Sequence, residues 1–312
     1  MNFKLNFEIQ PSDFSIQHGD GIIFLGSCFS DEIALKAKNS GMKVASNPFG
    51  TVFHPTLLSR FIRESIVGVE QERVFLRNDI YLSWDANSTV FNFSKEELNV
   101  KLKALRNDFV SNLKISKVVY ITFGTAWGYR LIENDQLVAN CHKLPSVKFE
   151  KELSEINVLY SEWIQTIQLI KSVNPTIEIV FTVSPVRHIR DGLIENNQSK
   201  AILIELVRML TLDFENHYFP SYEIVIDELR DYRFYKLDRI HPSEEAIEYV
   251  WKSFEKMYFD EKTILLNQKV SNFRKSLSHR SIHNGSKEDI NHKRNIQKQL
   301  NEFLEQNTEI IF

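Results

Sequence analysis

The stretch that decides the fold reads Ile-Ile-Phe-Leu-Gly-Ser-Cys-Phe and spans residues 22–29. Its first four residues are apolar, which is typical of a buried β-strand. Gly26 lets the backbone turn tightly, and a helical pattern follows over residues 31–39 and ends near Gly41. In a parallel α/β sheet the turn after a strand lies at the carboxyl edge, where ligands bind. Ser27 and Cys28 occupy that turn.

The same alternation of short apolar runs and helical patterns continues along the chain. Further strands are expected at residues 42–45, 118–123, 177–183 and 222–226, and helices at 149–170, at 199–214 and from Ser243 onward. The sequence therefore predicts an α/β fold, a three-layer α/β/α sandwich with a mostly parallel five-stranded sheet of flavodoxin-like order.

Two insertions and a tail depart from this alternation. Residues 73–93 and 130–141 are predicted to form antiparallel strands, and insertions at a loop edge commonly shape a pocket. Residues 261–312 are predicted to form a helical C-terminal extension to a domain that covers residues 1–260. A capping box at Ser286 and Asp289 begins its last helix, whose narrow apolar stripe must pack on the body or on a second copy of the chain. A homo-oligomer formed through these helices is therefore one expectation.

Composition narrows the class of partner. The chain has 312 residues, 43% of them hydrophobic, and a net charge of −3, so no basic field indicates nucleic acid. A run of about 18 apolar residues and a leader pattern are both missing, so we expect a cytoplasmic protein without a membrane partner. The two cysteines, Cys28 and Cys141, are expected to be free thiols.

Nucleophilic catalysis is the chemistry that the turn at Ser27 suggests, although a serine there also serves as an ordinary helix cap. A base is available in Asp238-Arg239-Ile240-His241, which precedes the helix that begins at Ser243. A spacing of three residues lets the carboxylate hold the imidazole Nδ1 while Nε2 faces a hydroxyl. Asp289 and His292 share the spacing, but they lie in a polar helix with no strand before it.

Cys28 is the alternative nucleophile, since thiols at helix N-termini have lowered pKa values. It is equally interpretable as a small buried apolar side chain. Successive residues that leave a strand point to opposite sides, so only one of Ser27 and Cys28 can face the crevice.

Several motifs in order resemble a known family. A strand that ends in Gly-Ser and a late Asp-x-x-His-Pro resemble the SGNH or GDSL hydrolase superfamily. Within it, the chain is similar over about residues 20 to 258 to the GSCFA-domain family, on the motifs Gly26-Ser27-Cys28-Phe29, Asn47-Pro48-Phe49-Gly50-Thr51, Phe123-Gly124-Thr125-Ala126-Trp127, Asn140-Cys141-His142-Lys143 and Ser184-Pro185-Val186-Arg187-His188.

The resemblance implies a catalytic triad of Ser27 as nucleophile, His241 as general base and Asp238 as orienting carboxylate. It implies an oxyanion hole made by the backbone N–H groups of Ser27 and Gly50. The superfamily's third donor is an asparagine, but this chain has Gly124-Thr125 at that place, which leaves Thr125 or Asn140 as the donor. The residues expected to line the substrate pocket are Asn47, Gly124, His142, Arg187 and His188.

The resulting hypothesis is a serine ester hydrolase that cleaves an O-acyl ester of a carbohydrate or other small molecule through an acyl-enzyme on Ser27. No cofactor and no metal are required, because His142, His188 and His241 lack the spacing of metal ligands. Two alternatives stay open: a non-catalytic member of the fold that binds a ligand or partner, and an O-acyltransferase.

Overall fold

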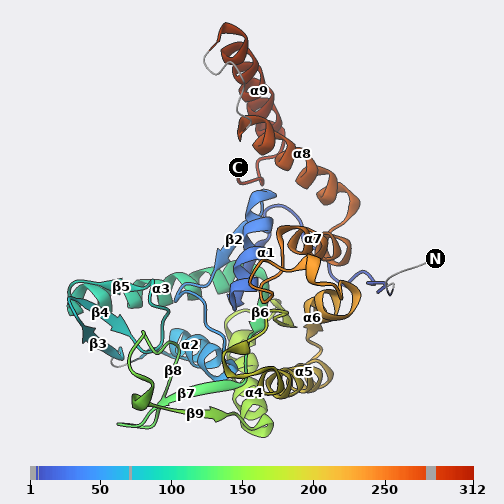
Figure 1. Ribbon diagram of the computed structural model, residues 1–312. Coiled ribbons are helices and arrows are strands. Elements are labelled where there is room, and N and C mark those ends of the chain that lie inside the picture. Colours follow the sequence, from blue (N-terminus) through green and yellow to red (C-terminus); the bar gives the residue numbers. More distant parts are fainter. Residues whose placement is uncertain (1–4, 6, 70–71, 279–285) are drawn as a thin grey trace.

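The computed structural model describes residues 5, 7–69, 72–278 and 286–312. A five-stranded sheet at its centre has the order β11-β10-β6-β1-β2, and every neighbouring pair is parallel (Figure 1). The strands are β1 (Gly21–Gly26), β2 (Lys43–Ser46), β6 (Ser116–Phe123), β10 (Glu178–Val183) and β11 (His217–Tyr218). The predicted α/β class and parallel five-stranded sheet are confirmed.

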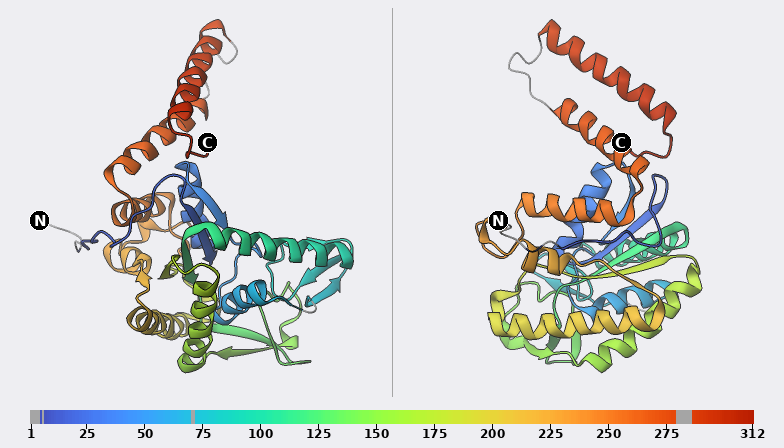
Figure 2. Two further views of the ribbon diagram at one scale, coloured as in Figure 1. Left: turned by 180° about the vertical axis from the view of Figure 1, so that it is seen from behind. Right: turned by 90° about the vertical axis from the view of Figure 1, so that its right-hand side faces the viewer.

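Helices cover both faces of the sheet (Figures 1 and 2). In β1, Ile22 and Phe24 pack with α1 (Cys28–Asn39) and α7 (Glu244–Tyr258), while Ile23 and Leu25 point to the opposite face. That face is covered by α2 (Pro55–Val67), α3 (Lys95–Ile115), α4 (Ile156–Val173) and α5 (Leu193–Phe214). Side chains alternate along a strand, so an unbroken apolar run supplies two separate cores.

Three predicted elements differ from the structure. The run 222–226 is helical, formed by α6 (Ser221–Glu223) and the π-helical turn η3 (Ile224–Glu228); β11 is instead the edge strand. Ile224 and Val225 are buried beneath α7, and burial gives a short helix the same apolar signature as a strand. The helix predicted over 149–170 begins only at Ile156, because β9 (Phe149–Leu153) pairs with β7. Conversely, α5 begins before residue 199, at Leu193.

Both predicted insertions form antiparallel sheets. The first contains β3 (Val74–Arg77), β4 (Ile80–Ser83) and β5 (Phe91–Asn92). In the second, β7 (Trp127–Leu131) pairs with β8 (Gln136–Val138) and β9, and η1 (Ser146–Lys148) leads into β9. Two 3₁₀ turns, η2 (Ile189–Asp191) and η4 (Tyr232–Phe234), lie in loops at the carboxyl end of the sheet.

The C-terminal extension consists of α8 (Glu261–Ser278) and α9 (Lys287–Gln306), which project together from the body (Figures 1 and 2). Ile296 and Leu300 of the predicted stripe are buried, and Phe303 packs on Phe273 of α8, so the stripe packs within the same chain. The side chain of Asp289 lies outside the description, so the capping box and the Asp289–His292 pair are not described. None of the helices in the described segments is long and apolar enough to span a bilayer.

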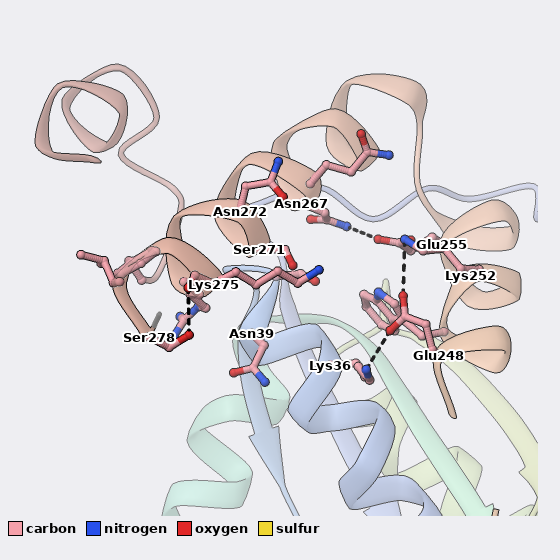
Figure 3. Close-up of a pocket in the computed structure, with 16 residues that line it drawn as sticks. Lys36, Asn39, Glu248, Lys252, Glu255, Asn267, Ser271, Asn272, Lys275 and Ser278 are labelled. Atoms are coloured by element: carbon pink, nitrogen blue, oxygen red, sulfur yellow. Dashed lines mark hydrogen bonds and ion pairs between the residues drawn. The ribbon is translucent and has the colours of Figure 1, made fainter. Parts of the chain in front are cut away.

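A polar cleft of about 1180 Å³ separates α8 from α1 and α7 (Figure 3). Its side chains bind one another: Lys36 pairs with Glu248 at 2.8 Å, and the Glu255 carboxylate accepts from Lys252 at 2.7 Å and from Asn267 at 3.1 Å. The last residues of the chain contact the turn after α1, where Ile310 packs on Gly41 and the Ile311 N–H donates to the Gly41 carbonyl. The extension is thus attached to the body by polar contacts and by its own last residues.

Candidate active site

The turn between β1 and α1 depends on Gly26. Its φ is +128°, and a Cβ there would lie 2.1 Å from the Thr122 carbonyl oxygen of β6. Any other residue would be strained and would also push the two central strands apart. Ser27 follows as N-cap in extended conformation, but its side chain makes no capping hydrogen bond.

Ser27 and Cys28 are placed differently. The Ser27 side chain is fully buried, and its Oγ has no hydrogen-bond partner in the described part of the chain. Cys28 is half-buried and lines a small cavity of about 30 Å³ together with Val186, Lys236 and His241. Of the two candidate nucleophiles, the structure brings Cys28 rather than Ser27 to the cavity of the predicted base.

Asp238 and His241 have the predicted geometry. Asp238 Oδ2 lies 2.7 Å from His241 Nδ1, and Asp238 Oδ1 accepts from the backbone N–H groups of Ile240 and His241 at 2.9 and 3.0 Å. The Ile240 and His241 N–H groups and the imidazole itself hold the pKa of the Asp238 carboxyl far below its usual range. The carboxylate therefore stays ionised and fixes the orientation of the imidazole.

The loop that carries this pair is anchored at several points. Arg239 has a left-handed backbone (φ 61°), and the Lys236 N–H donates to the His241 carbonyl at 2.8 Å. Arg187 stacks over the Tyr235 ring at 4.4 Å and donates to the Arg239 carbonyl at 3.3 Å. Arg187, expected in the substrate pocket, thus supports the loop of Asp238 and His241.

Burial and the negative charges of Asp31 and Glu32 raise the pKa of the Cys28 thiol. Cys28 is therefore a neutral thiol near pH 7 and needs a base to attack a carbonyl. Lys236 Nζ and Glu32 Oε1 lie 3.3 Å apart beside the same cavity, which connects α1 to the loop of His241.

The sequence profile of the GSCFA family matches residues 21–254. The chain belongs to the GSCFA family. Among solved structures, the crystal structure of a carbohydrate esterase family 3 protein from Talaromyces cellulolyticus resembles the chain, with a TM-score of 0.38 and 6% identity over 80% of this chain and 99% of that one. No curated protein matches it.

In this GSCFA chain three residues predicted as oxyanion donors form hydrogen bonds within the protein, but only the Gly50 N–H is shown to act as a donor there. The Gly50 N–H donates to the Asn47 carbonyl at 2.8 Å. Thr125 Oγ1 accepts the Trp127 N–H and bonds to Ser199, and Asn140 Oδ1 accepts the His142 N–H at 2.6 Å. Neither Thr125 nor Asn140 lines the cavity of Cys28 and His241, whereas the N–H of Ser27 stays a prediction.

Three of the predicted substrate-pocket residues have structural roles. The Asn47 carboxamide accepts the Gly26 N–H at 2.7 Å and donates to Asp31 at 2.8 Å. Gly124 has its N–H bonded to the Phe53 carbonyl and its own carbonyl bonded to Lys200. The His142 ring is buried, with Nδ1 bonded to Ser88 and Nε2 to the Ser83 carbonyl, both at 2.8 Å. These polar groups hold loops of the protein, and their contact with substrate stays a prediction.

His188 is the remaining residue expected in the substrate pocket. It lines a larger cavity of about 650 Å³, which also contains Thr125 and Asn140. The loop after β10 contributes to both cavities, since Val186 lines the small one and His188 the large one.

Lys200 is a site residue that the sequence reasoning missed. It is buried on α5, where its Nζ donates to the carbonyls of Gly124 at 2.7 Å and Ser184 at 2.6 Å. It thereby joins the loops after β6 and β10. The signal was present in the sequence: Lys200 falls at helical spacing on an apolar stripe with Leu203 and Val207.

Proposed function

We propose that the chain is an acyl-ester hydrolase in which His241, oriented by Asp238, activates a nucleophile in the turn between β1 and α1. The observation that carries the proposal is that His241 both binds Asp238 at 2.7 Å through Nδ1 and lines one cavity with a nucleophilic side chain, Cys28. The family resemblance supports an O-acyl ester of a carbohydrate or another small molecule as substrate.

The geometry favours Cys28 over Ser27 as the attacking group. His241 Nε2 accepts the thiol proton as Cys28 Sγ bonds to the ester carbonyl carbon. Collapse of the tetrahedral intermediate expels the alcohol, which takes the proton from the imidazolium. Water, deprotonated by His241, then cleaves the thioester and releases the carboxylic acid and the free thiol. Because the pKa of Cys28 is raised, the proton must move during the attack, and the His241–Asp238 pair is required for it.

The experiment is acylation by p-nitrophenyl acetate, followed by intact-mass analysis after an acid quench, together with steady-state release of nitrophenol. We expect wild type to become acylated once. Cys28→Ala should lose the adduct and at least about 10³-fold in turnover. Cys141→Ala is the matched control, since it removes the second free thiol, and it should behave as wild type.

His241→Ala and Asp238→Asn should slow acylation of Cys28 without unfolding the protein, because both side chains are more than 40% exposed. Labelling that survives Cys28→Ala but disappears in Ser27→Ala would identify Ser27 as the nucleophile, as the sequence alone suggests. A folded wild-type protein that is never acylated by acetyl or longer-chain aryl esters would refute the hydrolase and favour a binding role.

A further inference from the structure

The larger cavity beside the catalytic pair has a distinct chemistry. Its walls include the aromatic rings of Phe53, Trp127 and Tyr129, and its polar rim carries two cations, Lys143 and Arg190. No aspartate or glutamate is among the described residues that line it. A cavity of about 650 Å³ is the size that small-molecule sites usually have.

The aromatic wall is built rigidly. The Trp127 indole Nε1–H donates to the Glu195 carbonyl at 2.9 Å, and Lys151 Nζ lies 3.9 Å from the centre of that ring. Phe53 packs edge-on against His188 with ring centroids 5.3 Å apart. An apolar group that enters the cavity therefore meets preformed surfaces and orders few side chains when it binds.

The cation Lys143 is presented by strained backbone. His142 and Lys143 are consecutive non-glycine residues with left-handed φ values of 49° and 55°. This backbone conformation is unfavourable for residues other than glycine, and it persists only where neighbouring contacts enforce it. The contacts are the two ring bonds of buried His142 and the bond from its N–H to Asn140. Within the motif Asn140-Cys141-His142-Lys143, the contacts of Asn140 and His142 thus fix the position of Lys143.

Lys143 and Arg190 have no carboxylate partner among the described residues. Within the described part of the chain neither forms an ion pair with a carboxylate, unlike Arg60, Arg73 and Arg106, which bind the carboxylates of Asp85, Glu64 and Glu72. Two cations without carboxylate partners at the rim of an apolar cavity repel a cationic ligand and attract an anion. Arginine can bind a carboxylate or phosphate through two parallel hydrogen bonds.

We infer that this cavity binds the part of the substrate remote from the scissile ester, and that this part is an apolar group bearing a carboxylate or phosphate that pairs with Lys143 and Arg190. The inference rests on the proposed function, and it links the two cavities through the loop after β10, which lines the cavity of Cys28 and His241 with Val186 and the larger one with His188. It adds the charge of the substrate, which the family resemblance does not supply.

The test measures binding rather than turnover, so that its failure and the failure of the hydrolase are distinguishable. Cys28→Ala protein is titrated calorimetrically with octanoate, octyl phosphate and 1-octanol. We expect one of the two anions to bind at least about 10-fold more tightly than the alcohol, as charge-assisted hydrogen bonds imply, and to weaken as salt is added. The tighter of octanoate and octyl phosphate identifies the anionic group.

Charge-removing variants make the assignment specific. In the same background, Lys143→Met and Arg190→Met should each weaken the anion about 10-fold and leave 1-octanol unchanged. Lys148→Met is the matched control, since this exposed lysine lies on η1 outside the cavity, and it should have no effect. Equal affinity for octanol and both anions, or anion binding that is insensitive to both variants, would overturn the inference even if wild type hydrolyses neutral esters.

Discussion

Asn47 offers the sharpest test of how the nucleophile is positioned. Its carboxamide accepts the Gly26 N–H at 2.7 Å and donates to Asp31 at 2.8 Å, and its own φ is +35°. Replacing it with alanine leaves the buried Gly26 N–H without an acceptor, which costs about 1–3 kcal/mol. A left-handed alanine adds roughly 1 kcal/mol. We therefore expect Asn47→Ala to lose about 2–4 kcal/mol of unfolding free energy.

Urea unfolding of three variants separates these contributions. Asn47→Gly retains the backbone freedom and loses only the hydrogen bonds, so it should be destabilised by about 1 kcal/mol less than Asn47→Ala. Asn78→Ala, at the exposed turn between β3 and β4, shares the left-handed backbone (φ 52°) without the buried bond and should cost only about 1 kcal/mol. If Asn47→Ala unfolds within about 0.5 kcal/mol of wild type but raises KM, Asn47 binds substrate and the reasoning is wrong.

Three further outcomes follow from the same contacts. Gly26→Ala should yield no soluble folded protein, as expression and circular dichroism would show, because its Cβ would lie 2.1 Å from the Thr122 oxygen. Arg187→Met should lower kcat about 10-fold with KM nearly unchanged, because it loosens the loop of His241; a raised KM alone would instead show that Arg187 contacts substrate. Burial lowers the pKa of Lys200 from 10.5 to about 7. Between pH 7 and 10.5 the unfolded chain therefore binds more protons than the folded one. The unfolding free energy of wild type should rise with pH in this range, by up to about 1.4 kcal/mol per pH unit. Lys200→Met should lack this slope in urea titrations from pH 7 to 10, and an equal slope in both proteins would contradict the assignment.

The central sheet and the contact between Asp238 and His241 are predictable from the sequence for a physical reason. Apolar runs such as residues 22–25 and 118–123 must be buried on both faces, so their length and order identify a parallel sheet. Asp238 and His241 interact within one turn of chain, so their geometry is local. The run at 222–226 is helical and not the predicted strand, because an apolar pattern alone does not distinguish a buried strand from a short buried helix.

The choice between Ser27 and Cys28 could not be made in the same way. It depends on which way the backbone turns at the end of β1. That turn is fixed by two contacts with residues far away in the chain: Gly26 lies close to the Thr122 carbonyl, and the Gly26 N–H donates to the Asn47 side chain. Contacts between residues so far apart in the chain leave no periodic signal in the sequence. In the structure the Ser27 side chain is buried and Cys28 lines a cavity, which is the basis for proposing Cys28.

A common physical pattern distinguishes the residues that hold the site from those free to act in it. A polar residue in a loop looks the same in sequence whether it binds a substrate or a backbone group. The Asn47 carboxamide and the buried His142 ring form hydrogen bonds with other groups of the protein, as most buried polar groups do. His241 Nε2 has no partner in the described segments and, like Lys143 and Arg190, retains its capacity at the surface of a cavity. A substrate needs polar groups that are unpaired at the surface of a cavity and are carried by residues with a fixed backbone. In this chain such groups lie at the carboxyl edge of the sheet.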